Sequence, residues 1–225
     1  MYGLPGETLT SWKKDLKQAL SLHPEHISAY HLIYEEGTPL WKLREQHKVE
    51  EADEDLSVSL FGTLIDELTT AGYEHYEISN FCKPGMYSRH NTSYWQGILY
   101  LGRGPSAHSF DGGSREWNVA SLNQYLSSVE QGQRQHETEQ LDTRTRYNEY
   151  IITGLRTMWG ISTEELKKKF GDRLSKYCLE QARSYLENGK LELHNDRLKL
   201  TRDGIFISDG IMSDLLELSL IHISE

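Results

Sequence analysis

The sequence predicts an α/β protein whose last third forms a small winged-helix-like α+β unit. Strand-like and helix-like segments alternate over residues 1–80, and helices with one short hairpin follow residue 143. The charge also changes along the chain: residues 1–142 hold 11 basic and 21 acidic residues, whereas residues 143–217 hold 13 basic and 12 acidic. We therefore expect two domains, 1–142 and 143–217.

In the first domain, the pattern predicts strands and helices in turn. Thr8 or Thr10 is expected to cap a helix, Ile27–Ile33 to form a strand with apolar residues on both faces, and Asp53–Thr70 to form an amphipathic helix. Tyr73–Ser79 is the next expected strand. Because a helix separates successive strands, we expect them to be parallel and joined by right-handed crossovers.

Residues 80–120 are rich in Gly, Ser, Asn and His, and we expect loops there, followed by a helix at Ser121–Gln131. Later helices are expected at Thr145–Trp159, Glu164–Phe170, Leu174–Asn188 and Ile205–Leu216, with a hairpin over residues 191–200. Helices followed by a small hairpin are typical of a winged helix.

The two ends of the sequence carry separate expectations. Met1–Gly6 resembles the end of a buried strand followed by a turn, so we expect further sequence upstream. Residues 218–225 resemble the translation of a sequencing adapter, and we expect a non-native tail there; a short amphipathic tail is the alternative.

Composition excludes several classes of protein. The sequence has no run of about 18 apolar residues, and its N-terminus lacks a basic segment followed by an apolar one, so we expect a cytoplasmic protein without a membrane span. The formal charge of −10 disfavours nucleic acid as a partner. A winged-helix module that binds DNA through residues 143–217 stays open as a third hypothesis, although its charge is nearly balanced.

The densest group of chemically useful side chains lies at residues 88–95 and 100–109. Imidazoles, an amide, large aromatic rings and guanidinium groups occur together there, as a flat aromatic ligand with carboxylate arms would require. An imidazole could ligate iron, and Arg89 or Arg103 could bind a carboxylate. Alternatively, this is a packed loop in which Tyr94 and Trp95 fill core space and His90 is only hydrogen-bonded.

The sequence resembles the HemW-type heme chaperones, relatives of the oxygen-independent coproporphyrinogen III oxidases in the radical S-adenosylmethionine superfamily. The resemblance covers residues 1–217 and includes MYGLPGETLTSWKKDL, AGYEHYEISNF and YLGRGPSAHSF. Its most specific mark is the HNxxYW element, here residues 90–95, which favours the chaperones over the oxidases.

The resemblance implies the C-terminal part of a radical SAM (β/α)6 partial barrel, followed by the small C-terminal domain of these proteins. It implies a heme site with His90 as a ligand of the iron and Asn91, Tyr94 and Trp95 around it, with Arg89 and His108 as further candidates. In the related oxidases the position that matches Ile33 lines a second S-adenosylmethionine pocket, so Ile33 is a weaker candidate for that cofactor.

The resemblance also implies that the complete protein carries a [4Fe–4S] cluster and S-adenosylmethionine. Its partners would be heme and the apo-proteins that accept heme, including transient membrane-associated recipients. The alternative function is that of the oxidases, the oxidative decarboxylation of coproporphyrinogen III, so the sequence alone leaves open whether the protein is an enzyme.

We predict that this chain by itself cannot assemble a [4Fe–4S] cluster or perform radical chemistry. Cys82 and Cys178 are its two cysteines, and they cannot supply three clustered thiolates. After anaerobic reconstitution with iron and sulfide, the reduced chain should give no [4Fe–4S] EPR signal. A cluster signal in stoichiometric yield would contradict this prediction.

Overall fold

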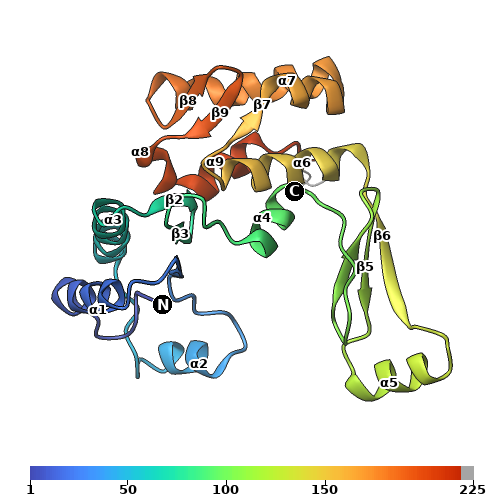
Figure 1. Cartoon of the computed structure of the whole chain (residues 1–225), viewed down its shortest axis with the longest axis horizontal. Coiled ribbons are helices and arrows are strands. Elements are labelled where there is room, and N and C mark those ends of the chain that lie inside the picture. Colours follow the sequence, from blue (N-terminus) through green and yellow to red (C-terminus); the bar gives the residue numbers. More distant parts are fainter. Residues whose placement is uncertain (219–225) are drawn as a thin grey trace. The chain divides into compact units, whose positions relative to one another are not determined.

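A computed structural model of the chain describes residues 1–218 and divides them into two compact units. The first is Met1–Ser88 and the second begins at Arg89 (Figure 1). The domain boundary expected at residue 142 therefore lies inside the second unit. The division into domains 1–142 and 143–217 stays a prediction. The expected tail at 218–225 lies, except for Leu218, outside the described residues. Within the described range, no helix is long and apolar enough to cross a membrane.

Two helices form the core of the first unit. Helix α1 (Leu9–Ser21) begins at the cap Thr8, whose hydroxyl accepts a hydrogen bond from the amide of Ser11. Trp12 on α1 packs on α3 (Glu54–Thr70) and donates its indole N–H to the carbonyl of Leu60 at 3.0 Å. The leucines of α3 that face this core are fully buried: Leu60, Leu64 and Leu68.

The sheet of the first unit differs from the expected parallel one. Its strands are β1 (His26–Ser28), β2 (Glu74–Glu77) and β3 (Asn80–Cys82), in the order β1-β3-β2, and both pairings are antiparallel. Strands β1 and β2 do run in the same direction, but β3 lies between them. The sequence predicts loops from residue 80 onward, but β3 lies there and follows β2 after a two-residue turn that allows only antiparallel pairing.

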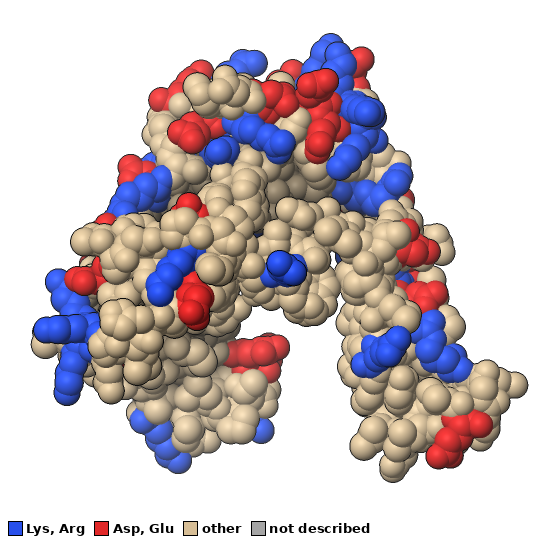
Figure 2. Space-filling model, in the orientation of Figure 1, with Lys and Arg blue, Asp and Glu red and all other residues tan. Residues whose placement is uncertain are grey.

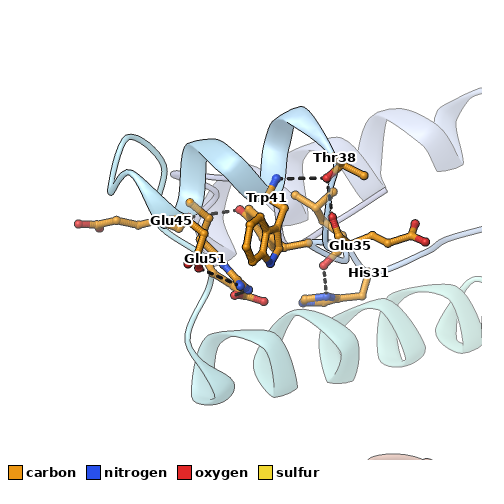
Figure 3. Close-up of polar contacts among 10 residues, drawn as sticks. His31, Glu35, Thr38, Trp41, Glu45 and Glu51 are labelled. Carbon is orange, nitrogen blue, oxygen red and sulfur yellow. Dashed lines mark hydrogen bonds and ion pairs between the residues drawn. The ribbon is translucent and has the colours of Figure 1, made fainter.

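The expected strand 27–33 is also shorter than predicted. Strand β1 ends at Ser28, and a single parallel bridge joins Tyr2 to His31 farther along. Helix α2 (Pro39–Glu45) follows and is capped by Thr38, which accepts from the amide of Trp41 at 3.2 Å (Figure 3). Arg44 on this helix pairs with Glu51 at 3.0 Å.

The second unit begins with helix α4 (Arg89–Trp95) and a sheet in a region where loops were expected. Strands β4 (His108–Phe110), β5 (Ser114–Asn118) and β6 (His136–Gln140) pair antiparallel in that order, and α5 (Leu122–Glu130) connects β5 to β6 (Figure 1). All five residues of β6 are exposed. Because the strand has no buried face, its sequence shows no alternation of apolar and polar residues.

The remaining elements agree with the expected winged-helix-like arrangement. They are α6 (Thr143–Leu155), β7 (Ile161–Ser162), α7 (Thr163–Glu187), β8 (Leu191–His194), β9 (Arg197–Leu200), α8 (Arg202–Ile205) and α9 (Ser208–Leu215). The strands form a sheet in the order β7-β9-β8. The expected separation of helices 164–170 and 174–188 is confirmed: α7 consists of two helical segments that meet at a kink, where Gly171 has a non-helical φ of 82° and ψ of 174°.

The β8–β9 turn is tied to the start of α7. Asn195 and Asp196 have positive φ angles, as a two-residue hairpin turn requires. The Asp196 carboxylate accepts hydrogen bonds from the Ser162 hydroxyl at 2.5 Å and from the amide of Glu164 at 2.9 Å. These bonds hold the pKa of Asp196 below its usual range and fix β9 next to α6 and α7.

Gly160 allows β9 to approach the end of α6, and it provides a test of this packing. It has a φ of 63°, and a Cβ there would lie 2.2 Å from the carbonyl oxygen of Leu198. Gly189 has a φ of 66° but no atom within 4 Å of such a Cβ. We expect Gly189→Ala to lower the free energy of unfolding by about 1 kcal/mol and Gly160→Ala by about 3 kcal/mol, in urea titrations. Equal losses would contradict this packing.

Candidate functional site

Helix α4 carries the predicted HNxxYW residues and presents His90 and Tyr94 on one face, since they are four residues apart. Arg89 and His90 are exposed, and the Tyr94 side chain is 40% exposed. The Ser93 hydroxyl bonds back to the carbonyl of Arg89 at 2.7 Å. The helix is followed by a turn in which Gly97 has a φ of 64°. His90 is thus an accessible imidazole on an ordered helix.

A row of aromatic rings runs from His90 to the sheet of the second unit. The ring centroids of His90 and Tyr94 are 5.0 Å apart, those of Tyr94 and Tyr100 are 4.8 Å apart, and both pairs meet edge to face. Tyr100 in turn lies 5.9 Å from Phe110. Two hydrogen bonds between the main chains of Tyr100 and Phe110 anchor the end of this row on β4. The row therefore fixes the orientation of Tyr94 next to His90.

A cavity of about 880 Å³ adjoins this row within the second unit. Tyr94, Trp95, Tyr100 and Phe110 line one side of it, and residues of α6, α7 and β9 line the others. Its volume lies in the usual range for sites that bind small molecules. The cavity is therefore large enough to take part of a flat organic ligand.

Two buried polar atoms of α4 make no hydrogen bond within the described part of the chain, the indole nitrogen of Trp95 and the hydroxyl of Thr92. Leaving such an atom unsatisfied costs roughly 1–3 kcal/mol unless water or a ligand binds it. The Arg156 guanidinium lies 5.1 Å from the centre of the Trp95 ring and stabilises that ring by a cation–π contact. Trp95 is thus held at the cavity with an unused donor.

The structure brings together only some of the residues predicted from the sequence. Tyr94 and Trp95 line the cavity, and His90 contacts Tyr94 at its edge. Asn91 is half-buried and, like Arg89, does not line the cavity. His108 on β4 is exposed, does not line the cavity, and packs near the Trp117 ring at 5.9 Å. Ile33 is 78% exposed and belongs to the first unit.

Sequence reasoning missed the charged residues of the cavity. Arg115 on β5 forms an ion pair with Glu149 on α6 at 2.8 Å and lies 5.9 Å from the centre of the Phe110 ring. Burial alone would lower the pKa of Arg115, but the hydrogen bond and the charge of Glu149 raise it above its usual value. The sequence does contain one indication of these residues. Arg146, Glu149 and Tyr150 are spaced so that they share one face of α6, and all three line the cavity.

The described residues do not fit an iron–sulfur cluster. Cys82 lies on β3 and Cys178 on α7, in different units, and both are buried. Burial raises the pKa of Cys82, and it raises that of Cys178 to about 11, so both thiols stay protonated at neutral pH. Over residues 1–218, no group of three His, Cys, Asp or Glu side chains is placed to hold a metal ion.

Comparisons with known proteins agree with the resemblance seen in the sequence. Residues 141–207 match the model of the HemN C-terminal domain. The chain is 30% identical over 217 residues to heme chaperone HemW of Bacillus subtilis and 32% identical over 218 residues to that of Lactococcus lactis, with 96% of this chain aligned in each case. It is also 30% identical to the mitochondrial radical S-adenosyl methionine domain-containing protein 1 of Danio rerio.

These relatives are longer than the present chain, which spans 57% of the two HemW proteins and 51% of the fish protein. Among solved structures, the coproporphyrinogen III oxidase HemN of Escherichia coli, a radical SAM enzyme, superposes with a TM-score of 0.71 at 20% identity. That superposition covers 95% of this chain and 53% of HemN, so the fold is that of the corresponding part of HemN. The chain belongs to the HemW family of radical SAM proteins.

Proposed function

We propose that the chain binds heme at α4, with the imidazole of His90 toward the iron, as part of a cytoplasmic chaperone that passes heme to apo-proteins. Two relatives that match 96% of the chain are named heme chaperones, which supports this proposal. The recipients would include soluble and transiently membrane-associated apo-proteins.

The observation that carries the proposal is the exposed imidazole of His90 at the end of the ring row, next to the cavity. An imidazole is a common axial ligand of heme iron, and aromatic rings pack well on the apolar faces of a porphyrin. A carrier must also release its cargo. An iron ligand on an exposed helix can be displaced by a ligand of the recipient more easily than one sealed in a core.

The neighbouring residues would have distinct roles. Tyr94 and Trp95 would contact the macrocycle, since both line the cavity. Arg89 lies next to His90 and could pair with a carboxylate arm from outside the cavity, while Asn91 would shape the inner side of the site. His108 is a second candidate for the iron, although its ring packs near Trp117 instead of Tyr94.

The radical SAM family carries a [4Fe–4S] cluster and S-adenosylmethionine, which supports their presence in the complete protein. The thiols of this chain do not fit that cluster, so its ligands would have to come from sequence outside the chain. The exposed side chain of Ile33 could contact S-adenosylmethionine in the complete protein, as the related oxidases suggest.

We expect His90→Ala to weaken heme binding at least tenfold, because it removes the proposed iron ligand. His136 on β6 provides the matched control: it is an exposed histidine of the same unit, remote from α4 in sequence, and bonds to the carbonyl of Arg134. Titration of ferric heme followed at the Soret band should give a weaker Kd for His90→Ala and an unchanged Kd for His136→Ala. Equal Kd values for the two variants would count against the site.

We also expect the complete protein to show no robust oxidase turnover. A chaperone binds a finished iron porphyrin, whereas an oxidase must bind coproporphyrinogen III and produce protoporphyrinogen IX. The assay supplies coproporphyrinogen III and S-adenosylmethionine to the complete, cluster-loaded protein under anaerobic conditions, with an oxidase of this superfamily as the positive control. Product formation at a rate comparable to that control would contradict the chaperone function.

A further inference from the structure

The cavity of the second unit is basic although the chain as a whole is acidic. Its lining includes five cationic side chains and two carboxylates, whereas the formal charge of the whole chain is −10. The cations are Arg115, Arg146, Lys169, Arg197 and Lys199. In Figure 2, Lys and Arg side chains lie over the part of the second unit that holds α6 and α7, with Asp and Glu side chains among them. Such a local excess of positive charge favours an anionic ligand.

Both carboxylates of the cavity already have cationic partners. Glu149 pairs with Arg115 at 2.8 Å, and Glu165 pairs with Lys169 at 3.7 Å. The other three cations, Arg146, Arg197 and Lys199, form no ion pair with any carboxylate among residues 1–218. These three side chains, which we call the cation group, therefore have their charge available to a ligand.

Regular structure places the cation group on the cavity. Arg146 lies one turn before Tyr150 on the face of α6 opposite to the buried Ile151 and Leu155. Arg197 and Lys199 alternate on β9 with Leu198, which is fully buried, so both point away from the core. The position of β9 is fixed in turn by the bonds of Asp196 to the start of α7.

Aromatic rings form another large part of the lining. Tyr94 and Trp95 come from α4, and Tyr150 and Phe170 pack against each other at 5.6 Å between α6 and α7. A site with aromatic walls and a few free cations suits a planar ligand with a small number of carboxylates better than a polyphosphate, which would need more cations. Tyr94 connects this cavity to His90, since it contacts the His90 ring and also lines the cavity.

We propose that the cation group binds the carboxylate arms of the porphyrin whose iron faces His90. This inference rests on the proposed heme-binding function and adds to it the part of the site that recognises the propionates. Arg146 and Arg197 can each donate two parallel hydrogen bonds to a carboxylate, and Lys199 supplies a further positive charge. The macrocycle would then lie along Tyr94, with its acidic edge inside the cavity.

The test compares iron protoporphyrin IX with its dimethyl ester, which has the same ring and metal but no carboxylates. We expect the 225-residue chain to bind the acid about tenfold more tightly than the ester. The double variant Arg146→Gln/Lys199→Gln should lose most of this preference, because it has lost two of the three cations and keeps only Arg197. Arg197→Gln, a single change at an exposed position of β9, should lose part of the preference.

The matched control is Arg144→Gln/Lys168→Gln, which removes the same charge from exposed positions of α6 and α7 that do not line the cavity. It should keep the full preference for the acid. Far-UV circular dichroism and urea unfolding show whether each variant is folded. If the double variant does not fold, the preference of Arg197→Gln is compared with that of the unaltered chain instead.

Four results would overturn the inference. If the control variant and the double variant Arg146→Gln/Lys199→Gln, the cavity variant, lose the preference for the acid equally, the preference depends only on the net charge of the chain. If the cavity variant and Arg197→Gln both keep the full preference for the acid, the cation group is not part of the binding site. Equal weakening of acid and ester in a folded cavity variant would show that the cations do not act on the carboxylates. If the unaltered chain binds neither porphyrin, the proposed function itself fails.

Discussion

The contact between Tyr94 and His90 is the interaction on which the functional account depends. Their rings meet edge to face at 5.0 Å, and Tyr94 also lines the cavity of the second unit. Tyr94 is held from the other side by Tyr100, which the main chain of Phe110 anchors on β4. A ligand on His90 would therefore meet an aromatic surface whose orientation the sheet has already fixed, so little side-chain entropy is lost on binding.

Local chemistry explains which elements the sequence could predict. Thr8 and Asp53 could be predicted as helix starts because their side chains can cap a helix. In the structure, each side chain accepts a hydrogen bond from the backbone amide three residues later. The spacing of Tyr147, Ile151, Leu155 and Met158 predicts the inner face of one helix; the first three are buried and Met158 is half-buried. The resemblance implied a heme site with Asn91, Tyr94 and Trp95 around it; Tyr94 and Trp95 line the cavity and Asn91 does not, and the binding of heme there stays a prediction.

Long-range pairing explains most of what the sequence could not predict. The three-residue strand β3 inserts between β1 and β2, and β6 pairs with β5 without burying a side chain, so neither shows a periodic pattern. The cation group was hidden for the same reason. Arg146 and Lys199 become neighbours of one cavity only because β9 returns to α6, and Gly160 leaves room for that approach.

Paramagnetic broadening tests the central claim most directly, because ferric heme broadens the NMR signals of nuclei near the iron. In the chain labelled with ¹⁵N-histidine, substoichiometric heme should broaden the imidazole signals of His90 first and leave those of His136 and His194 sharp. The ring protons of Tyr94 should broaden with those of His90. Sharp His90 signals at a heme concentration that saturates the Soret change would contradict the account, since heme would then be bound elsewhere on the chain.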